Sequence, residues 1–167
     1  MTRVSFPFVR FNKETGRSNK SSPGFQWEAA VGLSRVQNAS FRMFIVNTEG
    51  VVSGSRLTGR VRRASVKGEP GKRALYSTTA EVSILTNDGA EILMIDRGEW
   101  RGSKDAFARF MANQLVAPSE LYMVGVVRFQ TSDPRYAWLK EGDFLSHAVG
   151  EGDRIKISVY RTRAARK

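Results

Sequence analysis

The sequence predicts an all-β protein that carries one helix, built as an antiparallel sandwich or barrel. Three observations favour this fold class. Runs of β-branched and aromatic residues recur from residue 40 onward. The tripeptide Asn87-Asp88-Gly89 separates two such runs and is typical of a tight hairpin turn. Only one segment has the spacing of an amphipathic helix. Strands joined by short turns, with a single helix, indicate antiparallel sheets that pack together or close on themselves.

We expect strands at residues 40–47, 50–62, 75–86, 90–97, 121–131 and 154–162. Gly54 and Gly59 interrupt the second strand and indicate bulges or tight bends there. Residues 64–74 are rich in Gly, Lys and Pro and are expected to form a loop.

The helix is expected after Ser103, whose side chain can cap its N-terminus. Pro118 is expected to end it. Four apolar side chains share its inner face: Phe107, Phe110, Met111 and Leu115. A second helical turn is expected after Asp133-Pro134.

Composition limits the chemistry. The chain of 167 residues has no cysteine and one histidine, so disulfides, thiolate sites and multi-histidine metal sites are excluded. The segment from Gly54 to Gly59 lacks the Lys-Ser/Thr of a phosphate loop. We therefore expect no metal and no cofactor. With no apolar run long enough to span a membrane and no signal peptide, we expect a cytoplasmic protein without a membrane partner.

The net charge of +11 is unevenly spread, because residues 76–153 carry 7 basic and 12 acidic groups. Basic stretches such as residues 56–63 contain almost no aromatic residue on which a base could stack. Nucleic-acid binding is therefore the least favoured of the function classes, and solubilising charge on loops and chain ends is favoured over it.

Side chains of mixed character share one face of several predicted strands. On residues 90–97, Glu91, Leu93, Ile95 and Arg97 alternate along the chain. Glu81 on 75–86 and Arg128 on 121–131 belong to similar faces. Such a face fits the lumen of a small barrel that binds a ligand. The alternative is a solvated outer face with ordinary surface charges.

The run Phe129-Gln-Thr-Ser-Asp133-Pro-Arg-Tyr-Ala-Trp-Leu139 resembles the most recognisable stretch of the domain of unknown function 3237 family. The segments Gly54–Gly59, Thr86-Asn-Asp88-Gly89 and Ser119–Tyr122 fit that family in the same order. The resemblance implies a lipocalin-like antiparallel β-barrel over residues 39–162. It leaves an N-terminal extension at 1–38, with a flexible loop at 12–24, and a basic tail at 163–167.

Fungal relatives of this family imply a function in natural-product pathways. The resemblance implies a cofactor-independent cyclase or isomerase of a phenolic polyketide, in which a phenol or enol oxygen adds across an alkene. Many bacterial relatives have Tyr and Arg in place of Leu93 and Ile95, and Arg in place of Val124. The pocket of this chain is therefore expected to be more apolar.

These expectations define a candidate site. Glu81 or Glu91 would be the acid or base, and Arg97 or Arg128 would hold the phenolate or carbonyl oxygen. Six residues would bind the small hydrophobic phenolic ligand: Tyr122, Tyr136, Trp138, Leu93, Ile95 and Val124. A non-catalytic carrier of the same ligand is the alternative. A homodimer formed through an exposed strand or the Phe-rich N-terminus is left open.

Overall fold

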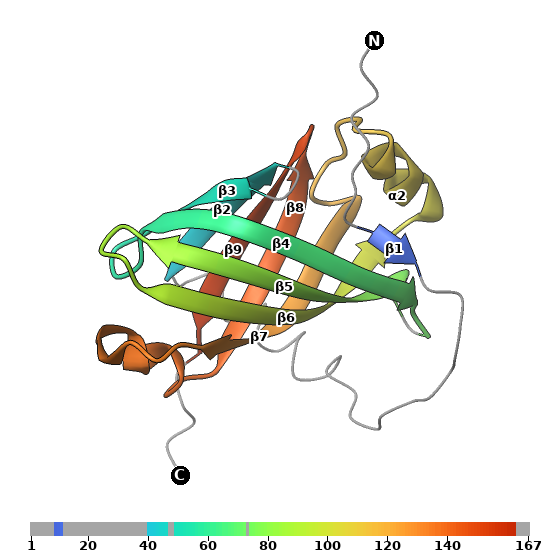
Figure 1. The fold of residues 1–167 in the computed structure, drawn as a ribbon. Helices are drawn as coiled ribbons and strands as arrows, with labels where there is room; N and C mark the ends of the chain where they lie inside the picture. The colour runs from blue at the N-terminus through green and yellow to red at the C-terminus, as the bar shows by residue number, and fades with distance from the viewer. Residues whose placement is uncertain (1–8, 12–39, 47–48, 73, 163–167) are drawn as a thin grey trace.

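Eight antiparallel strands close into a barrel in the computed structural model, which describes residues 9–11, 40–46, 49–72 and 74–162 (Figure 1). The barrel strands are β2 (Phe41–Val46), β3 (Glu49–Gly54), β4 (Gly59–Pro70), β5 (Tyr76–Thr86), β6 (Glu91–Gly102), β7 (Leu121–Gln130), β8 (Phe144–Glu151) and β9 (Arg154–Arg161). They pair in the order β4-β3-β2-β9-β8-β7-β6-β5, and β5 pairs back to β4. The barrel prediction is confirmed. A short strand, β1 (Val9–Phe11), lies parallel to β4 on the outside of this ring.

The predicted hairpin turn joins β5 to β6. Thr86 N donates to Ala90 O at 2.9 Å, and Gly89 N donates to Thr86 O at 3.0 Å. Gly89 has a φ of +88°, a left-handed conformation that favours glycine. The turn chemistry of the sequence and the observed turn therefore agree.

The prediction of one strand at 50–62 is wrong, because residues 55–58 separate β3 from β4. Strand β4 also continues beyond residue 62, so the expectation of a loop at 64–74 is wrong up to Pro70. Its pairing with β5 continues to Pro70, which lies opposite Tyr76. The register shifts between Val61 and Arg63, so Arg62 is an extra residue and both arginines are exposed. This bulge breaks the period-two alternation, which hides the second half of the strand in the sequence. Strand β8 was not predicted.

Helix α2 (Lys104–Met111) covers one end of the barrel (Figure 1). The predicted cap is confirmed, because Ser103 Oγ accepts a hydrogen bond from Ala106 N at 3.0 Å. Phe110 lies over Gly150 of β8, where a Cβ would come within 2.6 Å of its ring. The helix ends at Met111, well before Pro118. Leu115 therefore lies outside the helix and is 79% exposed, so its predicted place on the packed face is wrong.

The 3₁₀ helix η1 (Pro134–Leu139) covers the opposite end of the barrel and confirms the second predicted helical turn (Figure 1). Trp138 is buried against Phe144, with ring centroids 5.9 Å apart. From the β3–β4 loop, the Arg56 guanidinium lies 4.2 Å from the centroid of the Trp138 ring, and the neighbouring Leu57 is 1% exposed. Aromatic and aliphatic side chains therefore fill this end.

The predicted extension at 1–38, apart from β1, lies outside the described residues, as do its loop at 12–24 and the tail at 163–167. The domain boundaries therefore stay a prediction. Among the described residues, no helix is long and apolar enough to cross a membrane.

Candidate functional site

The interior of the barrel is mostly apolar, and among the described residues it contains a single carboxyl group. On β6 the inward-facing side chains of Ile92, Met94 and Trp100 are at most 6% exposed. Asp96 shares their face, halfway along the strand, and is 1% exposed. Among the described residues it is the only buried side chain of a charged type. A carboxyl group in such surroundings is costly to ionise, which is typical of functional rather than structural acids.

The strand register brings Ser146 to Asp96. Gly125 on β7 pairs with Gly98 on β6 and with Ser146 on β8. A Cβ at position 125 would overlap Asp96 Oδ1 and would lie 2.6 Å from Ser146 Oγ. The carboxyl and hydroxyl groups therefore meet over the Cα atom of Gly125, an approach that only glycine permits.

Neither group has a hydrogen-bond partner of good geometry within the part of the chain that the structure describes. This holds for both carboxyl oxygens of Asp96 and for Ser146 Oγ. Buried polar atoms without a partner are rare in folded proteins and indicate a water, an ion or a ligand at that position. The pair is therefore the best candidate for a functional site in the described interior.

Burial raises the pKa of Asp96 to about 7, against a smaller opposing influence of the Ser146 hydroxyl. Near neutral pH the protonated and ionised forms of this group are then similarly populated. A group with this property can both accept and donate a proton during one reaction cycle. Asp96 thus has the chemistry that the sequence analysis assigned to Glu81 or Glu91.

The four side chains predicted to be catalytic point away from the interior. Glu81, Glu91, Arg97 and Arg128 are all exposed on the outer wall. The prediction that their face lines the lumen is wrong, because the alternate residues of β5, β6 and β7 are the buried ones. On the outside these charges keep their hydration, whereas inside they would need close pairing. Arg128 instead pairs with the exposed Asp143 at 2.9 Å.

Four of the predicted ligand-binding residues also belong to the outward-facing set. Leu93 and Ile95 are half-buried on the outer wall of β6. Tyr122 stacks on His147, with ring centroids 5.9 Å apart. Val124 is 2% exposed but alternates with the inward-facing residues of β7. Their assignment to the pocket wall is therefore wrong.

Tyr136 and Trp138, the other two predicted binding residues, lie at the end of the barrel covered by η1. Both are buried, at 7% and 8% exposure. The Tyr136 hydroxyl donates to Asp88 Oδ1 at 2.9 Å, so it is engaged in holding η1 to the β5–β6 turn. Whether either ring contacts a ligand stays a prediction.

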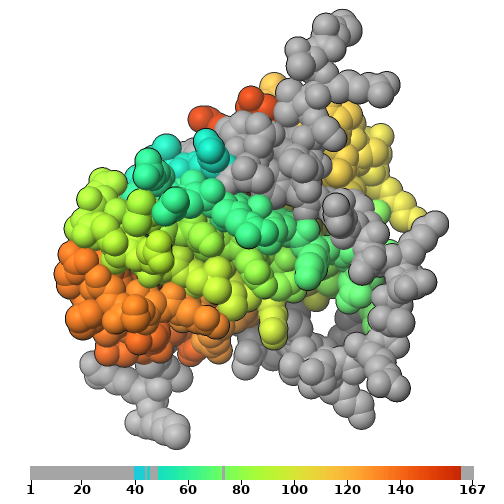
Figure 2. All heavy atoms as spheres, viewed as in Figure 1, coloured from blue at the N-terminus to red at the C-terminus, as the bar shows by residue number. Residues whose placement is uncertain are grey.

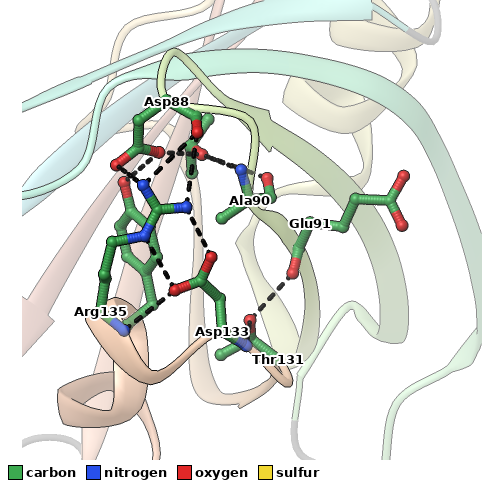
Figure 3. Close-up of polar contacts among 8 residues, drawn as sticks. Asp88, Ala90, Glu91, Thr131, Asp133 and Arg135 are labelled. Carbon is green, nitrogen blue, oxygen red and sulfur yellow. Dashed lines mark hydrogen bonds and ion pairs between the residues drawn. The ribbon is translucent and has the colours of Figure 1, made fainter.

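A cluster of polar side chains, here called the hairpin clamp, ties η1 to the β5–β6 turn (Figure 3). Its members are Thr86, Asp88, Asp133, Arg135 and Tyr136. Arg135 pairs with Asp133 at 2.6 Å and with Asp88 at 3.1 Å. The Thr86 hydroxyl donates to Asp88 Oδ1 at 2.5 Å. Hydrogen bonds from Thr86 and Tyr136 lower the pKa of Asp88, so this carboxylate is ionised at neutral pH. It accepts both hydrogen bonds and pairs with Arg135, and its role is therefore to hold the clamp together.

Among the described residues, no three His, Asp or Glu side chains are grouped closely enough to hold a metal ion. The expectation of a cofactor-free protein stays a prediction.

The family model described as "Protein of unknown function (DUF3237)" matches residues 20–162. The chain belongs to this family. The stretch that carries the resemblance, Asp133-Pro-Arg-Tyr-Ala-Trp138, forms η1 and part of the hairpin clamp. The recognisable DUF3237 residues of this chain therefore close one end of the barrel.

Curated relatives with the name UPF0311 protein match part of the chain. The protein from Bradyrhizobium diazoefficiens is 29% identical over 87 residues, which cover 52% of this chain and 57% of the relative. One from Rhodopseudomonas palustris is 28% identical over the same shares. The chain spans about half the length of the curated relatives it matches.

Solved structures share the barrel. A conserved protein of unknown function from Rhodopseudomonas palustris has a TM-score of 0.66 at 22% identity, over 74% of this chain and 94% of its own. A β-barrel-like protein from Acinetobacter baumannii has a TM-score of 0.57 at 24% identity, over 77% of this chain and 82% of its own. At these identities the likeness establishes the fold.

The sequence analysis missed Asp96 and Ser146. The sequence did contain one indication of Asp96. It follows Ile92 and Met94 at the spacing of two residues that places side chains on the same face of a strand, and no other charged residue of β6 lies on that face. Ser146 carried no such signal, since it lies on the strand that was not predicted.

Proposed function

We propose that the barrel binds one small apolar molecule in its interior and that Asp96 exchanges a proton with it. The buried pair of Asp96 and Ser146 carries this proposal, because the two polar groups face each other and have no other hydrogen-bond partner in the described chain. An eight-stranded barrel is wide enough to hold one small ligand. A hydroxyl group of that ligand would satisfy both buried side chains.

The reaction class that we infer is a cofactor-independent ring closure or isomerisation of a phenolic, polyketide-type molecule. The Asp96 carboxylate takes the proton of a phenol or enol hydroxyl, and the oxygen forms a bond to one carbon of an alkene. The protonated carboxyl group then delivers the proton to the other alkene carbon. No atom is gained or lost, so side-chain acid–base chemistry suffices.

The remaining interior supports this chemistry through shape. Apolar side chains such as Met94, Val127 and Ile157 surround the middle of the barrel and are at most 6% exposed. Such walls exclude water and hold a flexible substrate in a folded conformation, which lowers the entropy cost of closing a ring. The Ser146 hydroxyl would hold the reacting oxygen beside Asp96.

A non-catalytic carrier is the second candidate function. Asp96 is the only charged-type side chain among the buried residues described. Enzymes that run acid and base steps often use two groups whose pKa values are pushed apart. A carrier needs only one group to recognise a ligand hydroxyl, so a single interior carboxyl is compatible with binding alone.

The test combines native mass spectrometry with a turnover assay on a panel of phenolic polyketides. We expect one bound molecule per chain, little effect of salt, and a product of unchanged mass. Asp96→Asn should lower turnover by about 10²-fold or more while binding persists. Asp153→Asn, in the exposed β8–β9 turn, is the matched control.

Each other outcome selects an alternative. Binding without turnover by the unmodified chain would replace the enzyme with the carrier. Full turnover by Asp96→Asn would remove the acid–base role. A short DNA duplex in the same panel tests whether the positive net charge binds nucleic acid. DNA binding that falls steeply with salt, together with no binding of any small molecule, would favour a nucleic-acid-binding protein.

A further inference from the structure

The outer wall of β5, β6 and β7 carries apolar side chains that the interior does not use. They are half-buried and point away from the core: Leu85, Leu93, Ile95 and Val126. Figure 2 shows the β5 and β6 part of this wall at the front of the molecule, beside β4. An apolar patch with a charged border is typical of a protein interface.

The charges that border this patch are arranged along β6 in a simple order. The outward-facing residues are an acid, Glu91, two apolar residues, Leu93 and Ile95, and a base, Arg97. Arg97 is exposed and forms no ion pair with any described residue. The Glu91 side chain is 82% exposed, and its ion pair with Arg62 is long, at 4.0 Å. Among the described residues, neither charged end is therefore held in a close ion pair.

We propose that this wall binds the same wall of a second copy of the chain, so that the two β6 strands face each other and run antiparallel. A two-fold axis between the two walls relates the copies, and it crosses β6 at right angles at the level of Met94. Glu91 and Arg97 both lie three residues from Met94, and Leu93 and Ile95 both lie one residue from it. The rotation therefore places Glu91 opposite Arg97 of the partner subunit, and Leu93 opposite Ile95 of the partner subunit. A patch that complements itself in this way is what a two-fold dimer requires.

The neighbouring strands are compatible with the same arrangement. Glu81 on β5 pairs with Ile95 in the sheet, and Ser83 pairs with Leu93, so the rotation places Glu81 opposite a serine. Arg128 on β7 pairs with Ile95, and Gln130 pairs with Leu93, so Arg128 would lie opposite a glutamine. On β5 to β7 no like charges oppose each other.

Other modes of self-association fit less well. Parallel packing of the same wall would place Glu91 against Glu91 and Arg97 against Arg97, and like charges that face each other disfavour an interface. Pairing of strand edges is blocked around the ring of β2 to β9, because β5 pairs back to β4. Face-to-face packing of the wall therefore fits better than pairing of the strand edges in this ring.

Charge exchange tests this proposal. Sedimentation velocity of the full chain over a wide concentration range should show a monomer–dimer equilibrium. Glu91→Arg and Arg97→Glu should each weaken the dimer at least tenfold, because each places like charges together. The double variant restores opposite charges in exchanged positions and should recover most of the affinity. Glu141→Arg and Lys72→Glu, at exposed positions outside this wall, make matched charge changes and should have no effect.

A second variant tests the apolar centre. Ile95→Asp should leave the monomer folded, as checked by its thermal unfolding, and should abolish the dimer. A chain that stays monomeric at every concentration would overturn the proposal. So would single charge variants that weaken a dimer which the double variant does not restore, since the antiparallel register would then be incorrect.

Discussion

Asp96 illustrates how one buried residue can depart from the rule that charged groups stay at the surface. Its neighbours along the inner face of β6, Met94 and Gly98, are both buried, and Ser146 supplies the polar contact across Gly125. Water hydrates the carboxylate poorly there, which raises its pKa to about 7. A carboxyl group with this pKa can donate or accept a proton at neutral pH.

The same burial predicts how stability depends on pH. In the unfolded chain the pKa of Asp96 is about 3.9. Between that value and about 7, the folded state holds the proton and the unfolded state does not. Raising the pH through this window therefore lowers stability, and the loss levels off above pH 7. Asp96→Asn has no proton to lose and should gain roughly 2–3 kcal/mol relative to the unmodified chain between pH 5 and 8.

Urea unfolding of both proteins at pH 5 and 8 measures this difference. The comparison is needed because burial, and to a smaller extent Lys156, lowers the pKa of His147, which makes stability rise with pH over part of the same range. Asp153→Asn is the control and should follow the unmodified chain. Parallel pH profiles for Asp96→Asn and the unmodified chain would contradict the raised pKa.

The residues of the site were the least predictable part of the molecule. Strand β6 contains Ile92, Leu93, Met94 and Ile95 in succession, so either face could have been the inner one. The sequence analysis chose the face with Glu91 and Arg97 because ligand pockets combine apolar walls with polar groups. Solvation favours the opposite face as the inner one. The charges of Glu91 and Arg97 lose less solvation free energy on the outside, whereas the Asp96 carboxyl group can be buried in its neutral form.

At the scale of elements, the hairpin clamp explains why the recognisable DUF3237 stretch has its particular residues. Pro134 starts η1, Asp133 caps it by accepting from Arg135 N at 2.9 Å, and Arg135 reaches Asp88 in the turn. Trp138 then packs under Arg56 at the end of the barrel. The stretch therefore fixes the closed end.

Coupling between clamp residues gives a second stability prediction. Tyr136→Phe removes the hydrogen bond to Asp88 and should cost about 1–2 kcal/mol of unfolding free energy. Its effect should not add to that of Arg135→Gln, because both side chains act on the same carboxylate. Ser103→Ala, which removes the cap of α2 at the opposite end, is the control and should add to Tyr136→Phe. Urea unfolding of the single and double variants measures the loss of unfolding free energy for each pair. If the losses from Tyr136→Phe and Arg135→Gln add up as fully as those from Tyr136→Phe and Ser103→Ala, the clamp residues do not act together.

Elements with a local chemical signature could be predicted from the sequence. Asn87-Asp88-Gly89 specified its turn, and Ser103 specified the start of α2. Elements whose signature is interrupted were not recovered. The bulge at Arg62 concealed the second half of β4, and β8 contains His147 and Gly150 within a short strand.

At the scale of the whole molecule, the described residues form a barrel with α2 over one end and η1 over the other. The all-β fold class and the closure of the sheet into a barrel could be predicted from the sequence. The runs of β-branched and aromatic residues, the hairpin turn and the family resemblance all indicated the same fold. The charge pattern gains a simpler meaning at this scale. Residues 40–162 carry 18 basic and 14 acidic groups, so most of the excess of +11 belongs to the chain ends. The barrel itself is nearly balanced, as a small-molecule protein can be.

The central claim is that Asp96 is a buried carboxyl group that titrates near neutral pH, and it can be measured without knowing the substrate. The chain contains six aspartates, few enough to follow each carboxyl carbon by NMR in protein labelled at the aspartate side chains. We predict one carboxyl carbon with a titration midpoint near pH 7, and this signal should be absent from the spectrum of Asp96→Asn. A spectrum in which no aspartate carboxyl carbon has a midpoint near neutral pH would contradict the interior acid and the function proposed for it.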